Sequence, residues 1–207
     1  MKVLVLGGGG NVGEFVLKKL ADKGHEPVSI AQTENRAEEM RKLCSIEVIV
    51  ANEKEEITDA FVGCEAIIYL TGSNPIAGEE RDILVDYNSV VETIEEAKRR
   101  GIKRFIYLSA VRVDESDKSK TTGAKNEPEK LFVQEDLHYT IVRSSLATNI
   151  PGEGTIKAAN SIKEVGKLSN EDLASVLVEI LDSESLYKRE IEITGGETPI
   201  GKAMNDL

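Results

Sequence analysis

Short apolar runs alternate with amphipathic segments along almost the whole chain. The runs are rich in valine and isoleucine, which is typical of buried strands, and the segments between them carry apolar residues at the spacing of one helix face. The pattern predicts strands at Lys2–Leu6, Pro27–Ala31, Ile46–Ala51, Ala66–Thr71, Arg104–Ser109, Tyr139–Arg143 and Glu190–Thr194. It predicts helices at Val12–Lys23, Arg36–Leu43, Glu55–Phe61, Ile83–Arg100, Glu129–Asp136 and Asp172–Leu181.

This alternation predicts the fold class. Strands that alternate with helices form βαβ units with parallel strands, and near-continuous apolar strands are expected where helices cover both faces of a sheet. We therefore predict a doubly wound α/β (Rossmann) fold of three layers, with a parallel sheet of about six or seven strands. All 207 residues are expected to form one domain, in which residues 147–207 leave room for only a small substrate lid.

Charge and cysteine usage narrow the function. The chain has 26 Lys and Arg against 37 Asp and Glu, a net charge of −11, which argues against binding to nucleic acid or to an anionic membrane. Cys44, Cys64, His25 and His138 have no closely spaced partners, so no metal site is expected. Without a signal peptide or a long apolar run, we expect a cytoplasmic protein with a small-molecule substrate, and its oligomeric state stays open.

The glycine-rich loop after the first predicted strand is the most informative segment. Gly8, Gly10 and Gly13 fit the pattern GxGxxG, and Gly7, Gly10 and Gly13 fit GxxGxxG. Glycines let the main chain approach a pyrophosphate, and the following helix offers free N–H groups and a partial positive charge. Because the loop joins a strand to an amphipathic helix, it predicts a dinucleotide site; the alternative is a tight turn that binds nothing.

The end of the second predicted strand bears on the choice of cofactor. An acidic residue there would bind the ribose 2′-hydroxyl of NAD, and a nearby arginine would accommodate the 2′-phosphate of NADP. The neutral Gln32 holds this position, and Glu34 and Arg36 follow it. Both cofactors stay open, with a slight lean to NADP because the strand has no acidic end. The alternative for Arg36 is an exposed residue in the first turn of a helix.

Six segments in fixed order carry a family resemblance: VLGGGGNVG at 5–13, VIVANEKE at 48–55, GCEAIIYLTGS at 63–73, VDYNSVVETIEEAKRRGIKRFIYLSAV at 85–111, HYTIVRSSL at 138–146 and SNEDLASVLVEIL at 169–181. Through them the chain resembles the atypical short-chain dehydrogenase/reductases, in particular their small bacterial NAD(P)-binding, epimerase-like (NmrA-like) members. The resemblance covers nearly the whole chain, and GIKRFIYLSA followed by YTIVR is its more specific part.

The resemblance implies a role for each matching position. Ser109 matches the catalytic serine of the family, and Lys125 matches the lysine of its YxxxK motif. The implied cofactor contacts are Gly7, Gly10, Asn11, Val12, Gly13, Gln32, Arg36, Asn52, Thr71, Gly72, Ser73, Ser109, Lys125, Arg143, Ser144, Ser145 and Leu146.

The chain departs from the family at the position of the catalytic acid, a tyrosine. Thr121 stands in place of the tyrosine that protonates the carbonyl oxygen, and an aliphatic hydroxyl is far less acidic than a phenol. Pro128 favours a helix that begins near Glu127, which would leave Lys125 in a loop. Arg143 is followed by Ser144 where the family usually has proline.

The remaining tyrosines offer little replacement for the missing acid. Tyr69, Tyr107 and Tyr139 lie within predicted strands and are expected in the core. Tyr87, early in the long helix, is then the one candidate for a substitute acid.

Three functions remain after these departures. The first is an NAD(P)-dependent oxidoreductase that transfers hydride to a small or flavin- or quinone-like acceptor, which needs mostly positioning. The second is a nucleotide-binding sensor that has lost the chemistry, and the third is an epimerase or dehydratase that uses its cofactor transiently. Thr121 and Pro128 favour the sensor, but the oxidoreductase stays first as a class.

Overall fold

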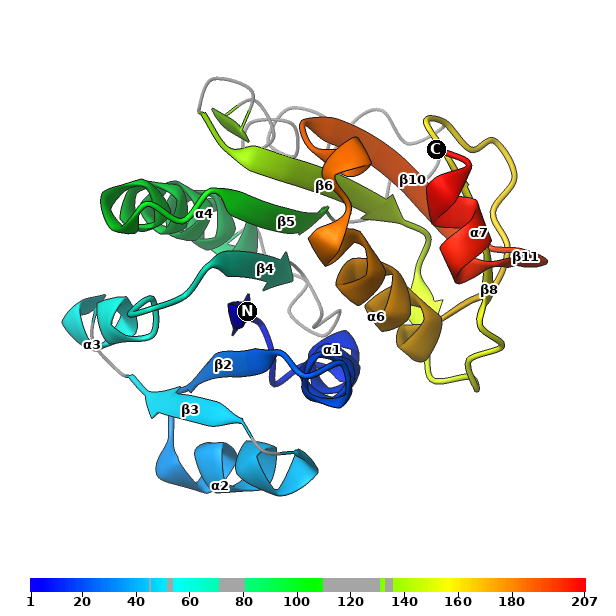
Figure 1. Cartoon of the computed structure of the whole chain (residues 1–207). Helices are drawn as coiled ribbons and strands as arrows, with labels where there is room; N and C mark the ends of the chain where they lie inside the picture. Colours follow the sequence, from blue (N-terminus) through cyan, green and yellow to red (C-terminus); the bar gives the residue numbers. More distant parts are fainter. Residues whose placement is uncertain (45, 52–53, 71–80, 110–130, 133–135) are drawn as a thin grey trace.

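One mixed sheet of nine strands runs through the molecule, with helices on both its faces (Figure 1). The computed structural model describes all of the chain except residues 45, 52–53, 71–80, 110–130 and 133–135, and leaves out the side chains of 54–56 and 81–89. The strands of this sheet are β1 (Lys2–Leu6), β2 (Glu26–Ala31), β3 (Glu47–Val50), β4 (Ala66–Leu70), β5 (Arg104–Ser109), β6 (His138–Ser144), β8 (Thr155–Ala159), β10 (Arg189–Gly195) and β11 (Thr198–Pro199). The helices are α1 (Asn11–Asp22), α2 (Glu34–Leu43), α3 (Lys54–Asp59), α4 (Arg81–Arg100), α6 (Asn170–Glu179) and α7 (Ile200–Asn205).

The strand order is β11-β8-β10-β6-β5-β4-β1-β2-β3. From β3 to β10 every neighbouring pair is parallel, which confirms the doubly wound sheet. The parallel part has seven strands, in agreement with the six or seven predicted, and β8 and β11, which were not predicted, extend its edge in antiparallel pairs. Both are short and carry few apolar residues, so periodicity does not reveal them. A separate pair, β7 (Ala147–Thr148) and β9 (Leu168–Ser169), is equally short.

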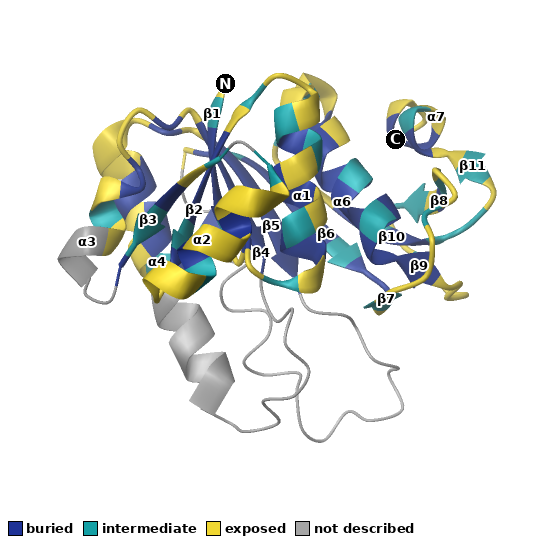
Figure 2. Ribbon diagram, turned by 90° about the horizontal axis from the view of Figure 1, so that it is seen from below, coloured by how far each residue is buried: buried dark blue, intermediate teal, exposed yellow. Residues whose placement is uncertain are grey.

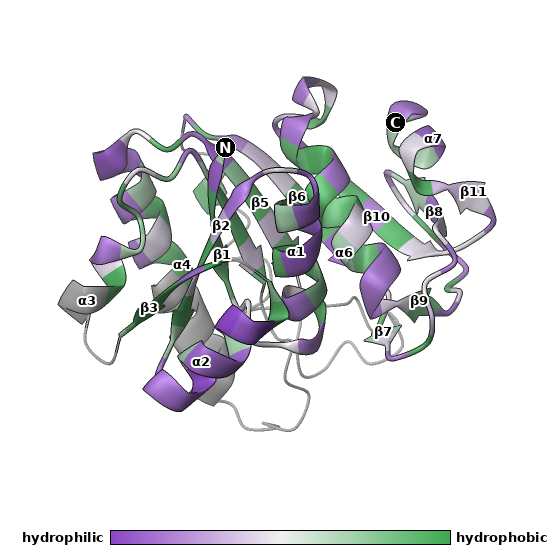
Figure 3. Ribbon diagram, turned by 60° about the horizontal axis from the view of Figure 1, so that its bottom comes forward, coloured by the Kyte–Doolittle hydropathy of each residue, from purple (hydrophilic) through white to green (hydrophobic). Residues whose placement is uncertain are grey.

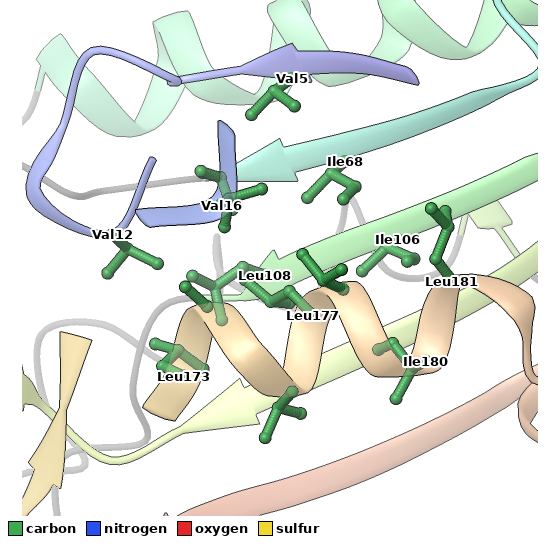
Figure 4. Close-up of a cluster of buried hydrophobic side chains, with 14 of the residues drawn as sticks. Val5, Val12, Val16, Ile68, Ile106, Leu108, Leu173, Leu177, Ile180 and Leu181 are labelled. Atoms are coloured by element: carbon green, nitrogen blue, oxygen red, sulfur yellow. The ribbon is translucent and has the colours of Figure 1, made fainter. Parts of the chain in front are cut away.

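Alternation along the strands separates two apolar cores. Val3 and Val5 face the layer that contains α1 and α6, whereas Leu4 between them faces the layer that contains α4. Figure 2 shows the buried strands between these helix layers, and Figure 4 shows side chains of α6 packed on those of β1, β4 and β5. The expectation for the tyrosines is confirmed, because Tyr69, Tyr107 and Tyr139 are all buried in the α4 layer.

Helix α6 is fixed at its carboxyl end by a buried arginine. Arg104 on β5 donates from Nε to the carbonyl of Leu181 at 3.0 Å, and it also bonds the carbonyl of Ile180. Its Nη1 donates to Oγ1 of Thr140 at 2.9 Å, and its guanidinium lies 4.7 Å from the ring centre of Tyr187. Burial lowers the pKa of Arg104 to about 10, which still leaves the side chain charged at neutral pH.

The surface helices show the polarity that their sequences predict. Only Ala37 and Met40 of α2 are buried, and Figure 3 shows this helix as mainly hydrophilic, whereas α6 turns an apolar side to the strands. Within the described ranges, no helix combines the length and the apolar character needed to cross a membrane. The predicted helix at 129–136 falls mostly outside the described residues.

Candidate functional site

The carboxyl ends of the central strands meet at one edge of the sheet. The register pairs Leu6 with Tyr69, and Ser109 with Arg143. The order of the strands reverses between β1 and β4, since β2 and β3 lie on one side of β1 and β5 and β6 lie beyond β4. Such a switch point is where open α/β sheets bind their ligands.

The glycine loop begins at this switch point. Gly7 has a φ of +83°, which favours glycine, and a Cβ there would lie 2.7 Å from the carbonyl oxygen of Leu70 at the end of β4. The N–H of Gly10 then donates to the carbonyl of Gly7 at 3.1 Å, which closes the turn. A larger residue at Gly7 would therefore strain the backbone and push β4 away.

Two further glycines bring helix α1 against strand β1. A Cβ on Gly13 would lie 2.4 Å from the carbonyl oxygen of Gly7 and 2.6 Å from Cα of Gly8. A Cβ on Gly8 would lie 2.3 Å from Oγ of Ser29, a buried side chain that donates to the carbonyl of Val5 at 2.9 Å. The loop is thus packed on backbone and on a fixed hydroxyl.

The N-terminus of α1 is not capped by any side chain among the described residues. Gly10 holds the N-cap position in an extended conformation and supplies only its backbone carbonyl, which accepts from the N–H of Glu14 at 3.0 Å. Two other helices whose starts are described differ: Thr33 caps α2 and Ser169 caps α6. Free N–H groups at a helix start, beside a loop without side chains, fit the pyrophosphate of a dinucleotide.

The side chain of Arg36 extends from helix α2 to this loop. Its Nη2 donates to the carbonyl of Gly9 at 2.6 Å and to Oε1 of Glu14 at 2.8 Å, and its Nη1 donates to Oε2 of Glu39 at 2.7 Å. Hydrogen bonds to Glu39 and then to Glu14 raise the pKa of Arg36 above its ordinary value. Gln32, at the end of β2, is exposed. Three partners therefore hold Arg36, the residue predicted from the sequence to lie near the adenosine ribose, beside Gly9 of the loop.

The far end of the site is built by β5, β6 and β10. Ser109 is buried at the end of β5, beside Arg143 on β6. The Nη1 of Arg143 donates to Oε2 of Glu190 at 2.6 Å, so this nitrogen is turned toward β10.

Hydrogen bonds of hydroxyl groups fix the loop after β6. Ser144 and Ser145 are both buried. Oγ1 of Thr194 donates to Oγ of Ser145 at 3.0 Å and accepts from the N–H of Gly166 at 2.8 Å.

Two apolar side chains are exposed next to this hydroxyl network. Leu146 follows Ser145 and is 67% exposed, and Val165 precedes Gly166 and is 70% exposed. Oγ of Ser145 lies 3.5 Å from the carbonyl oxygen of Gly166, so the two chain segments meet at this point. The carboxyl edge of β6 therefore presents apolar surface to solvent.

Other residues of the sequence prediction lie outside the described residues. They are Asn52, Thr71, Gly72, Ser73, Thr121, Lys125 and Pro128, together with the side chain of Tyr87. Their roles remain predictions from the sequence.

Residues 7–184 match the family of NAD(P)H-binding domains. The chain belongs to this family. It is 31% identical to the uncharacterized sugar epimerase YhfK of Bacillus subtilis, with both chains covered completely. A solved structure assigned as an NAD-dependent epimerase/dehydratase of Bacillus halodurans has a TM-score of 0.90 at 32% identity, again over both full chains. The oxidoreductase ylbE of Lactococcus lactis shares the fold with a TM-score of 0.82 at 23% identity, over all of this chain and 96% of the other.

These comparisons confirm the family resemblance read from the sequence. The protein is a member of an NAD(P)H-binding family with epimerase-like relatives, and its nicotinamide cofactor is NAD or NADP. The glycine loop of this NAD(P)H-binding domain is the segment whose described geometry fits a dinucleotide.

Sequence reasoning missed three residues that shape this loop of the NAD(P)H-binding domain. Ser29 packs against Gly8, while Glu14 and Glu39 bind the guanidinium of Arg36. Glu14 lies 22 positions from Arg36 in the chain, so no local pattern joins them. The only available signal for Ser29 is a small polar residue in the middle of a buried strand.

Replacing Gly13 by alanine should destabilise the protein, because the added Cβ meets backbone that cannot move without opening the loop. We expect the free energy of unfolding in urea to fall by about 1–3 kcal/mol, the usual cost of overpacking. Gly201→Ala is the matched control, since a Cβ there has nothing nearer than 4.0 Å and alanine favours its helix. Equal stability of the two variants would show that the loop is not tightly packed.

Proposed function

We propose that this protein is an NAD(P)H-dependent oxidoreductase that transfers hydride to a flat, flavin- or quinone-like acceptor. The observation that carries the proposal is the uncapped start of α1 behind a loop of close-packed glycines, at the switch point of the sheet. This arrangement supports a pyrophosphate bound at Gly7–Gly13, with Asn11 and Val12 beside it.

The remaining cofactor contacts follow the course of the sheet edge. The family resemblance supports Asn52 near the adenine, residues 71–73 along the cofactor, and the segment Arg143–Leu146 beside the nicotinamide. We favour NADP over NAD because β2 ends in the neutral Gln32 and Arg36 lies at the adenosine end of the loop.

The chemistry at the other end of the cofactor depends on what replaces the missing tyrosine. The bound nicotinamide would supply the hydride. Ser109, buried at the end of β5, would donate a hydrogen bond that orients the acceptor. With Thr121 in the tyrosine position, an acceptor that takes its proton from water suits the site better than a simple ketone.

The described surface supports an apolar acceptor. Leu146 and Val165 are exposed beside the end of β6, on the side where the resemblance puts the nicotinamide. Burying such side chains against a flat ring system is favourable by roughly 25 cal/mol per Å² of apolar area removed from water. Residues 147–207, which carry Val165, would act as the small substrate lid.

The names of two full-length relatives favour a second candidate, an NAD-dependent epimerase or dehydratase. This alternative predicts that NAD is regenerated in each cycle, so no net cofactor oxidation is observed. Incubating the protein with NAD and a nucleotide sugar, and following the sugar by NMR, distinguishes it from net hydride transfer.

Gly10→Val should abolish dinucleotide binding, because the side chain would occupy the space that a phosphate needs above the helix start. Titration calorimetry with NADPH is the measurement. Gly201→Val, in α7, is the control for a valine placed at a glycine far from the loop. The assignment of the pyrophosphate site would be refuted if the Gly10→Val protein bound NADPH as tightly as the unmodified one.

The unmodified protein should bind NADPH more tightly than NADH, since only NADPH carries a 2′-phosphate for Arg36. Arg36→Gln should weaken NADPH binding by about 10- to 100-fold, the effect of about 1.5–3 kcal/mol for a charged hydrogen bond, and should change NADH binding little. A tenfold preference of the unmodified protein for NADH would reverse the choice of cofactor.

Reduction of ordinary aldehydes and ketones should be very weak, because loss of a general acid typically costs 10²–10⁴-fold in rate. Oxidation of NADPH should instead be observed with flavins or quinones, followed by the loss of its absorbance. Ser109→Ala should slow that reaction by a larger factor than it weakens the binding of NADPH.

Two results would redirect the proposal. Ordinary rates with simple ketones would show that another acid replaces the phenol. Tight binding of NADPH without oxidation by any acceptor would favour the sensor. Thr121→Tyr should restore little ketone reduction alone and more when combined with Pro128→Ala, if Pro128 displaces Lys125.

A further inference from the structure

The guanidinium of Arg36, the proposed ligand of the 2′-phosphate, already has three hydrogen-bond partners within the protein. Arg36 is the third residue of α2, and its backbone N–H donates to Oγ1 of Thr33 at 3.3 Å. Its guanidinium binds Gly9 and Glu14 through Nη2 and Glu39 through Nη1. The side chain is 36% exposed, so it is open to a ligand that arrives from solvent.

The charges around this guanidinium oppose a phosphate. One arginine and two carboxylates give a local net charge of −1. A phosphate monoester carries about −1.5 to −2 at pH 7, so it would approach a cluster of its own sign. A 2′-phosphate therefore gains the full attraction of Arg36 only if one carboxylate leaves the guanidinium.

The two carboxylates hold the guanidinium differently. Glu14 belongs to α1 and shares Nη2 with the carbonyl of Gly9, so it fixes the arginine to the glycine loop. Glu39 lies one turn further along α2, binds Nη1 and is 63% exposed. Exposed pairs at this helical spacing contribute little stability, so Glu39 is the partner that a ligand displaces easily.

We propose that Glu39 is a specificity-determining residue, which competes with the 2′-phosphate of NADP(H) for Nη1 of Arg36 and so limits the preference of the site for NADP(H) over NAD(H). Glu14 has the opposite effect, because it holds the guanidinium on the loop where the phosphate would meet it. The inference rests on the proposed binding of a dinucleotide at the glycine loop and on the assignment of Arg36 to its adenosine end.

The variant Glu39→Gln tests the proposal, because it keeps the shape of the side chain and removes its charge. We expect NADPH to bind about 3- to 10-fold more tightly, since one opposing charge near 4 Å is worth about 1 kcal/mol in water. The affinity for NADH should change by less than about twofold, because NADH has no 2′-phosphate for the released nitrogen. Titration calorimetry with both nucleotides is the measurement.

Glu38→Gln is the matched control. Glu38 is the preceding residue of the same helix, is exposed and undergoes the same change of charge, but it is not among the described partners of Arg36. It should change both affinities by less than about twofold. An equal gain for NADPH in Glu38→Gln would attribute the effect to net charge and overturn the proposal.

A double variant separates competition from positioning. In Arg36→Gln, the further change Glu39→Gln should no longer tighten NADPH binding, because the contested guanidinium is gone. If Glu39→Gln weakened NADPH binding, Glu39 would be a support for Arg36, and the proposal would be wrong. If Glu39→Gln left both affinities unchanged while Arg36→Gln weakened NADPH binding, this inference would fail and the proposed cofactor site would stand. If neither nucleotide bound the unmodified protein, both would fail.

Discussion

The contact between Gly13 and the backbone of Gly7 and Gly8 is the constraint on which the site depends. With hydrogen atoms in place of side chains, helix α1 lies directly on the turn that leaves β1. The same closeness leaves the first N–H groups of α1 without a side-chain cap at the sheet edge. A loop whose geometry fits a pyrophosphate and a helix that packs on its strand are therefore two results of one set of glycines.

Two positive groups at this edge of the sheet oppose the net negative charge of the whole protein. The chain carries a net charge of −11, which on its own repels a dinucleotide. The start of α1 and the guanidinium of Arg36 provide the local attraction. Because Glu14 and Glu39 already hold that guanidinium, its charge is available only in part, and selectivity between nucleotides becomes a balance between carboxylates and phosphate.

Most of the central sheet could be predicted from the sequence. Its strands are near-continuous apolar runs, its helices carry apolar residues on one face, and several of these elements end at glycines. The antiparallel strands β8 and β11 were missed, because five and two residues of mixed polarity carry no period. The side chains around Arg36 were missed for another reason: Glu14 and Arg36 meet only after β1, α1 and β2 have folded.

Buried polar side chains hold helix α6 at both ends. At its start, Oδ1 and Oδ2 of Asp172 accept the N–H groups of Gly154 and Glu153 at 2.8 and 3.0 Å, which fixes the loop that leads into β8. Just beyond its end, Arg104 binds the carbonyls of Ile180 and Leu181 in the 3-10 turn that follows. Both groups are buried, so each would be costly to leave without its partners.

The same region anchors the chain that carries the exposed apolar residues. The hydroxyl of Thr194 joins Ser145 to Gly166, and so holds the bases of Leu146 and Val165 on the frame of β6 and β10. An apolar pair presented on fixed backbone loses little conformational freedom when a rigid ring system covers it. In the function that we propose, positioning by this frame matters most, because a flat flavin- or quinone-like acceptor can take its proton from water.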